Sequence, residues 1–276
     1  MKNIMLCLVF LPWILVGQKV SIEQINESRS TQNSYFGNRC EVSLQVSGDV
    51  VRKYKFAKIA KVLKAVDDQG LDLLSDESNT SRYSELSGTQ AYVSILLLPA
   101  SRKAATIKEL TGEVVLYDPT EANGGIVKVK NIGKSTNKNL ASNVPGLSVM
   151  YLTKESLEKM ATEQQKMKEA ELKKQPKEMQ ELAKELERLI DAFTYMGMSG
   201  NEVTFYVKGD VGKLDNISFE TPDGTYIGNN GWSATGDLVT YYFGEEIQSS
   251  FTVVLSVETP TSIKKVPFAL KDIDLP

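Results

Sequence analysis

The chain has 276 residues, of which 24% are charged, and a net charge of −3 at pH 7. It contains no histidine, which excludes Ser-His-Asp and Cys-His catalysis as well as histidine-ligated zinc. Nucleic acid and anionic membrane surfaces are disfavoured as partners, because both require a positively charged patch. Neither a G-x-S-x-G motif nor a phosphate-binding glycine loop occurs. We therefore expect a protein that is not an enzyme and that uses no cofactor and no metal.

The N-terminus has the pattern of a signal peptide. Lys2 precedes residues 4–16, which carry no charge, and Gly17 ends the apolar run. This run is too short for a bilayer, which takes about 20 apolar residues. We expect residues 1–17 to be cleaved off and the chain to be exported to the periplasm, the cell surface or the extracellular medium, without a membrane span. Cys40 is then the single cysteine left, either buried as a small apolar residue or available for pairing between chains.

Alternating apolar and polar residues predict β-strands along most of the remaining chain. Residues 91–98 are almost continuously apolar, which predicts a strand buried on both faces. Residues 54–66 fit either a strand or one helical face, and we favour the strand. The clearest alternating sets are Val42, Leu44 and Val46; Leu147, Val149 and Tyr151; Val203, Phe205 and Val207; and Phe251, Val253, Leu255 and Val257.

The strand pattern predicts a mainly β protein of two tandem Ig-like β-sandwich domains. We place the first domain at residues 18–150 and the second at 199–276, with strands from 126–151 as candidates to complete the second. Residues 46–50 (VSGDV) resemble residues 207–211 (VKGDV), and a turn, an apolar strand and an Ile-Lys pair follow each at similar spacing. This order favours an internal duplication.

Residues 151–198 have a different composition and predict a helical insertion. From 153 to 196 glycine is absent and strong helix formers dominate, with Thr153 as the N-cap. Pro176 either kinks one long helix or separates the two arms of a helical hairpin. An apolar stripe on the second part packs on the protein itself or binds a partner, and its residues are Met179, Leu182, Leu186, Leu189 and Phe193.

Exposed aromatic residues near the C-terminus are candidates for ligand binding. Trp232 follows an Asn-Asn-Gly turn, with Tyr226, Tyr241 and Tyr242 close by in the sequence. Aromatic rings exposed on a sandwich can stack on sugars, although large aromatics more often fill a core. Tyr241 and Tyr242 are adjacent in a strand and must point to opposite faces. The acidic segment 67–72 is read as a turn, with a weak calcium site as the alternative.

Two stretches are similar to segments of uncharacterised exported bacterial β-sandwich proteins. They are residues 66–70 with 101–112 (SRKAATIKELTG), and residues 266–276 (VPFALKDIDLP). The resemblance implies the fold and export, and it transfers no catalytic or binding residue.

Together these patterns favour an exported, non-catalytic interaction or scaffolding protein of the bacterial cell envelope. Its expected partner is a protein or glycan of the envelope, and the sequence does not set its oligomeric state. The alternative is a carbohydrate-binding module built on the aromatic residues around Trp232.

Overall fold

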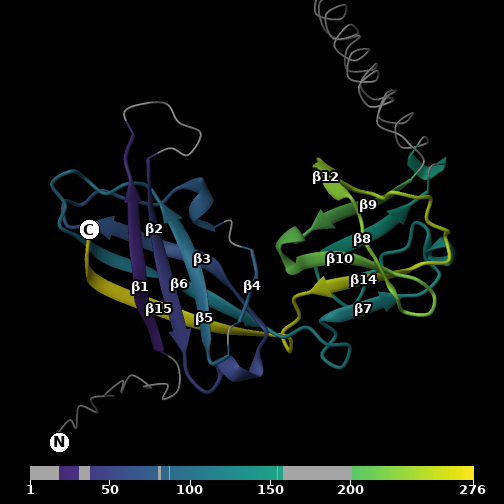
Figure 1. Cartoon of the computed structure of the whole chain (residues 1–276), viewed down its shortest axis with the longest axis horizontal. Helices are drawn as coiled ribbons and strands as arrows, with labels where there is room; N and C mark the ends of the chain where they lie inside the picture. Colours follow the sequence, from purple (N-terminus) through teal and green to yellow (C-terminus); the bar gives the residue numbers. More distant parts are fainter. Residues whose placement is uncertain (1–18, 31–37, 80–81, 87, 154, 158–200) are drawn as a thin grey trace, which may run out of the picture. The chain divides into compact units, whose positions relative to one another are not determined.

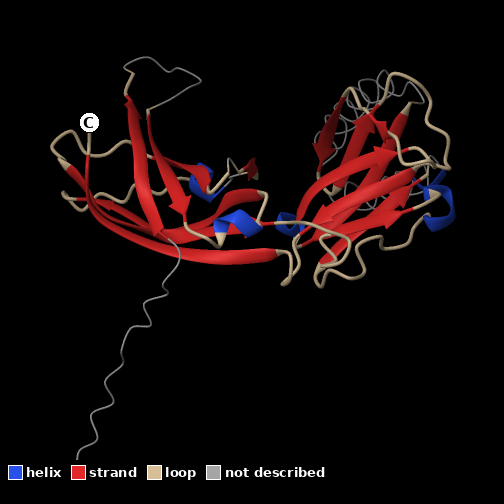
Figure 2. Cartoon of the chain, turned by 60° about the horizontal axis from the view of Figure 1, so that its bottom comes forward, coloured by secondary structure: helices blue, strands red, loops and turns tan. Residues whose placement is uncertain are grey.

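A computed structural model describes residues 19–30, 38–79, 82–86, 88–153, 155–157 and 201–276. These residues are mainly β-strands joined by turns, loops and a few short 3₁₀ helices (Figures 1 and 2). The chain divides into two compact units, which we call unit 1 and unit 2. Unit 1 contains the chain up to Asp118 together with Ile263–Pro276, and unit 2 is Pro119–Ser262.

Unit 1 consists of two antiparallel sheets, which we call sheets A and B. Sheet A has the order β1-β2-β5, and sheet B has the order β15-β6-β3-β4. Two 3₁₀ helices, η1 (Val51–Lys53) and η2 (Asp76–Asn79), connect strands of this unit. The strands are β1 (Lys19–Ser28), β2 (Arg39–Ser47), β3 (Phe56–Asp67), β4 (Ser84–Glu85), β5 (Gln90–Leu97), β6 (Thr106–Tyr117) and β15 (Ile263–Asp274).

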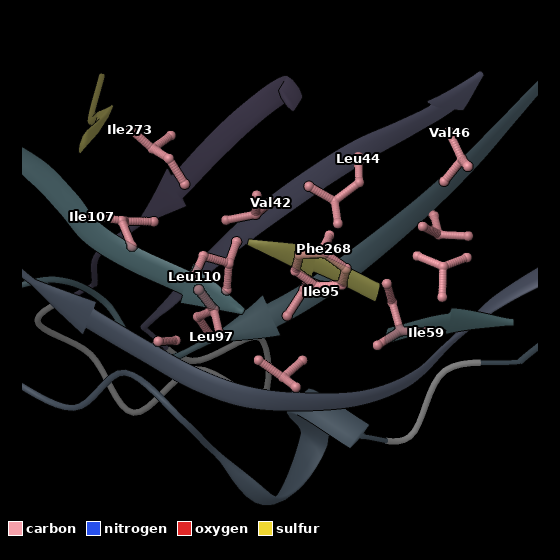
Figure 3. Close-up of a cluster of buried hydrophobic side chains, with 14 of the residues drawn as sticks. Val42, Leu44, Val46, Ile59, Ile95, Leu97, Ile107, Leu110, Phe268 and Ile273 are labelled. Carbon is pink, nitrogen blue, oxygen red and sulfur yellow. The ribbon is translucent and has the colours of Figure 1, made fainter. Parts of the chain in front are cut away.

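The core of unit 1 lies between its two sheets. Leu44 and Ile95 project from sheet A, and Ile59, Leu110 and Phe268 from sheet B, into one buried cluster (Figure 3). Burial of a side chain of this size stabilises the fold by about 1.5–3 kcal/mol. Removal of apolar surface from water is therefore what holds the two sheets of this unit together.

Unit 2 also consists of two antiparallel sheets, C (β11-β10-β14-β7) and D (β12-β13-β9-β8). Its core is rich in aromatic rings: Phe219 of sheet C lies 5.0 Å from Tyr241 and 6.1 Å from Phe205 of sheet D, centroid to centroid. The 3₁₀ helices are η3 (Ile132–Ser135) and η4 (Val211–Lys213). The strands are β7 (Ile126–Val129), β8 (Leu147–Leu152), β9 (Glu202–Gly209), β10 (Leu214–Glu220), β11 (Tyr226–Ile227), β12 (Gly231–Thr235), β13 (Leu238–Tyr242) and β14 (Thr252–Val257).

The division into units differs from the predicted boundaries at residues 150 and 199. Strand β15 pairs along the whole length of β6, from Ile263 opposite Tyr117 to Asp274 opposite Thr106, and so belongs to unit 1. Strands β7 and β8 pair instead with β14 and β9 in unit 2. The suggestion that strands from 126–151 complete the second domain therefore fits the pairing, whereas the assignment of 263–276 to that domain does not. Alternation reveals a strand but not its partner.

Strand β5 corrects another expectation. Ala91, Val93, Ile95 and Leu97 are buried, but Tyr92 is 43% exposed and Ser94 is also exposed. The strand is therefore buried on one face only. Its outward positions include apolar residues, which made the sequence look uniformly apolar.

The predicted duplication holds only locally. Strands β2 and β9 each lead through a glycine with positive φ, Gly48 and Gly209, into a 3₁₀ helix and a further strand. The subsequent pairing differs, because β5 pairs with β2 whereas β14 pairs with β10. The final strands of the two proposed copies, β6 and β15, are partners in one sheet. The two halves therefore do not share a topology.

The predicted helical insertion lies largely outside the described residues. Residues 155–157 are helical, and Ser156 N donates to Thr153 Oγ1 at 3.2 Å, which confirms Thr153 as an N-cap. The apolar stripe from Met179 to Phe193 is not among the residues that the structure describes. No helix within the described ranges is both long and apolar enough to cross a bilayer.

Candidate functional site

An open groove lies in unit 2. Its volume is about 440 Å³, within the range of small-ligand sites. The residues that line it come from the turn after β10, from β11 and from the segment that follows β13: Thr221, Pro222, Ile227, Gly228, Phe243, Gly244, Glu245, Glu246, Ile247, Gln248, Ser250 and Phe251. We call this cavity the unit 2 groove.

One wall of the groove is set by a tight turn between β10 and β11. Gly224 N donates to Thr221 O at 2.9 Å, and Gly224 has a φ of 93°, which favours glycine. The Asp223 carboxylate accepts a hydrogen bond from the Thr221 hydroxyl. This bond, and a second one from the backbone N–H of Thr225, hold the pKa of Asp223 below its usual value. The turn returns the chain so that Ile227 lies opposite Phe219 and reaches the groove.

The floor of the groove is aromatic. Phe243 and Phe251 are buried, and both rings make edge contacts with Phe219, at centroid distances of 5.0 and 5.8 Å. Phe243 is anchored through its N–H, which donates to Asn201 O at 3.0 Å. These contacts fix the apolar floor as part of the unit 2 core, so the groove does not depend on a loose surface loop alone.

The rim of the groove carries negative charge. Glu245 and Glu246 are adjacent and exposed, and neither forms an ion pair with a residue of the described ranges. Asp223 lies in the turn whose residues Thr221 and Pro222 line the groove. An apolar floor beneath a carboxylate rim favours a ligand that combines an apolar group with a positive charge.

Of the four predicted ligand-binding aromatics, Tyr241 is a core residue. It is 8% exposed, and its ring makes edge contacts with Phe205 and Phe219. Burial raises the pKa of its phenol to about 12. A direct role for Tyr241 in ligand binding is therefore inconsistent with its position. Of the adjacent pair Tyr241–Tyr242, Tyr241 is the one that points into the core between the two sheets.

The remaining three aromatics do not form one platform. Trp232 lies opposite Tyr241 across the β12–β13 pair and thus on the inner face of sheet D, but it stays 53% exposed because β12 is the edge strand. Tyr242 points to the outer face, where its hydroxyl lies 2.8 Å from Ser233 Oγ. Tyr226 is 66% exposed on β11 of the other sheet.

Tyr226 is the predicted residue that lies beside the groove. A Cβ atom added to Gly228, which lines the groove, would lie 3.9 Å from Cε1 of the Tyr226 ring. Of the four aromatic residues predicted to bind a ligand, Tyr226 is therefore the one next to a groove residue. The other walls of the groove were missed because Phe243, Phe251 and the Glu245–Glu246 pair come together only through the pairing of β10 with β11 and the return of the chain after β13.

The acidic segment 67–72 is a turn, as the sequence predicts. The buried Asp67 carboxylate accepts from the N–H groups of Gln69, Leu71 and Ser101 at 2.9, 2.8 and 2.8 Å. Asp68 accepts from Ala105 N at 3.0 Å. The carboxylates are thus directed at backbone donors, and within the described residues no group of three or more Cys, Asp or Glu side chains is placed to hold a metal ion.

Comparison with known proteins gave no relative: no family model matches the sequence, and neither the curated proteins nor the solved structures include a match.

Proposed function

We propose that this chain is an exported, non-catalytic interaction protein of the bacterial cell envelope, and that the unit 2 groove binds a segment of a partner protein. The proposal depends on an aromatic floor, formed by Phe243 and Phe251, beneath a rim that carries Glu245 and Glu246. Neither glutamate forms an ion pair with another described residue.

The chemistry of the groove defines the segment that fits. A leucine or aromatic side chain would remove apolar surface from water against the floor. A lysine or arginine beside it in the partner would face the glutamate pair, where opposite charge speeds association and selects the register. The segment is therefore a short apolar–cationic peptide.

The groove supports binding better than catalysis. Glu245 and Glu246 are both exposed on the same rim, whereas paired catalytic carboxylates flank a bond in a cleft and have environments that separate their pKa values. The chain has no histidine to act as a general base near pH 7. These features favour reversible recognition.

The test is binding to an immobilised peptide library in which apolar and cationic residues are varied independently. We expect the purified chain to select peptides with adjacent apolar and basic residues. Changing both rim residues, Glu245→Gln and Glu246→Gln, is expected to weaken binding about tenfold and to reduce its salt dependence. Glu121→Gln, a change at an exposed carboxylate of unit 2 outside the groove, serves as the matched control.

The carbohydrate-binding alternative has one structural observation in its favour, the exposure of Trp232 and Tyr226. A glycan-array signal lost in Trp232→Ala, with peptide binding absent, would replace the peptide proposal with this one. Selection of apolar–cationic peptides that is equally strong in the Glu245→Gln, Glu246→Gln variant would also overturn the assignment of the groove.

A further inference from the structure

The outer face of sheet A presents a surface of unusual chemistry in unit 1. Inward positions such as Val42, Leu44 and Ile95 are buried, so the alternate residues point away from the core. The pairing of β1, β2 and β5 aligns these outward residues in rows across the three strands. The rows are Lys19, Ser47 and Gln90; Ser21, Gln45 and Tyr92; Gln24, Ser43 and Ser94; Asn26, Glu41 and Leu96; and Ser28 with Arg39, while Glu23 is exposed at the β1 bulge between Ser21 and Gln24. We call these residues the sheet A face.

Amides and hydroxyls dominate the sheet A face, and its four charged residues are Lys19, Glu23, Arg39 and Glu41, two of each sign. The outer face of sheet B, in the same unit, has the opposite character. Its outward positions include Lys64 paired with Glu109 at 2.6 Å and Lys265 paired with Glu113 at 3.3 Å. The sheet A face differs from that of sheet B in that uncharged hydrogen-bonding groups, and not cross-strand ion pairs, fill its central rows.

The central rows are held in place by cross-strand hydrogen bonds. Ser43 Oγ and Ser94 Oγ lie 3.1 Å apart. The Tyr92 hydroxyl accepts from Gln45 Nε2 at 3.1 Å and donates to Gln90 Oε1 at 2.7 Å. These contacts orient the Tyr92 ring while leaving that residue 43% exposed. The face is thus organised before any ligand arrives, which lowers the entropic cost of binding.

We propose that the sheet A face is a docking surface for an uncharged polysaccharide. Each sugar unit offers hydroxyls that both donate and accept, which matches the amides of Gln24 and Gln45 and the hydroxyls of Ser43 and Ser94. The apolar face of a sugar ring can stack on the Tyr92 ring. Uncharged polymer suits this surface because its two positive and two negative side chains cancel, so the face offers no net charge to a polyanion or polycation. The proposal is independent of the unit 2 groove.

The test is affinity electrophoresis of the purified chain through gels that contain cellulose derivatives, mannan or β-1,3-glucan, each uncharged. We expect retardation by at least one of them that persists in high salt, because no ion pairs are involved. The double variant Gln45→Ala, Tyr92→Ala is expected to weaken binding at least tenfold. Tyr92→Phe retains the ring and is expected to retain most of the binding, and Leu63→Ala, an exposed change on β3 of sheet B, is the matched control.

Circular dichroism and the melting temperature identify any variant that fails to fold. If the double variant does not fold, the single variants Gln45→Ala and Tyr92→Phe are compared in its place. Retardation by none of the three polymers, binding that high salt abolishes, or binding unchanged in the double variant would each overturn the proposal. A dimer of the chain that Ser43→Lys dissociates would overturn it as well, since the face would then be an interface between copies. Loss of peptide selection by the unit 2 groove leaves this proposal unaffected.

Discussion

Tyr117 and Ile263 are direct partners across the β6–β15 pair, although the whole of unit 2 lies between them in the sequence. Unit 2 is therefore inserted at the position where a hairpin turn would join two neighbouring strands of sheet B. Backbone pairing continues from these residues to Thr106 and Asp274 at the far end of both strands. Unit 1 thus combines strands from before and after the insertion in the sequence.

This relationship predicts that unit 1 folds without unit 2. Replacing residues 119–262 by a short Asn-Gly turn segment joins two strand ends that already lie side by side, so the closure entropy is small. We expect β-type circular dichroism and a cooperative thermal transition. The control is the fragment 19–150, which ends at the boundary predicted for the first domain and lacks β15. It leaves one edge of β6 unpaired and is expected not to fold cooperatively, and an intact transition in that fragment would contradict the inserted arrangement.

A second prediction concerns Asp67, whose carboxylate accepts three backbone N–H groups while being fully buried. Asp67→Ala leaves these donors without a partner and is expected to destabilise the protein by about 2–4 kcal/mol. Asp72→Ala is the matched control, because Asp72 is exposed and accepts a single bond from Leu74 N, and it is expected to cost below about 1 kcal/mol. Urea unfolding measures both. A rise in melting temperature on adding calcium would revive the metal-site reading of this turn.

The bulges in β3 show why this segment looked ambiguous in the sequence. The register of β3 against β6 shifts between Ile59 and Lys61 and again between Val62 and Lys64. Each extra residue moves the next inward position by one, so the buried residues Ile59, Val62 and Ala65 recur every third residue. Repeated bulges in a strand therefore produce the spacing of buried residues that is typical of a helix. Composition does not distinguish a bulged strand from a helix.

Other features were predictable to the extent that they are local. Strict alternation identified β2, β9 and β14, and the hydroxyl of Thr153 identified its N-cap. Partner choice between strands far apart in the sequence has no local signal, so the placement of β15 in unit 1 was missed. The unit 2 groove was missed for the same reason, because its walls meet only through long-range pairing.

A third prediction concerns Cys40, which is completely buried and lies opposite Glu27 in the β1–β2 pair. Burial, and to a lesser extent the Glu27 carboxylate, raises the pKa of its thiol from 9.0 to about 11. We expect no reaction with a thiol reagent at pH 8 in the native protein and complete reaction after unfolding in urea. Reaction of the folded chain at the rate of a free thiol would contradict this, and would restore pairing between chains as an option.

The same shift has a consequence for stability. A raised pKa in the folded state means that the folded protein retains the proton more strongly than the unfolded chain. The contribution is therefore fully present below pH 9 and is lost as the pH rises through about 11. We expect the urea midpoint of the protein to decrease as the pH is raised from 9 to 11. In Cys40→Ala, which starts from a lower stability, the decrease over the same pH range is expected to be smaller. Equal pH dependence in the two proteins would assign the loss to other groups.

A final prediction concerns Gly209, which ends β9 and has a φ of 91°. A Cβ atom there would lie 1.9 Å from the backbone oxygen of Gly146, which cannot move aside without disturbing the neighbouring strand β8. Positive φ and the clash act together, so Gly209→Ala is expected to destabilise the protein by at least about 2 kcal/mol. Gly212→Ala is the control, because the nearest atom to an added Cβ is Asp210 Oδ1 at 3.9 Å and its φ is not positive. Equal urea midpoints for the two variants would show that the β9–η4 turn relaxes freely, and that the glycine shared by the two Val-x-Gly-Asp-Val segments is not required by the backbone.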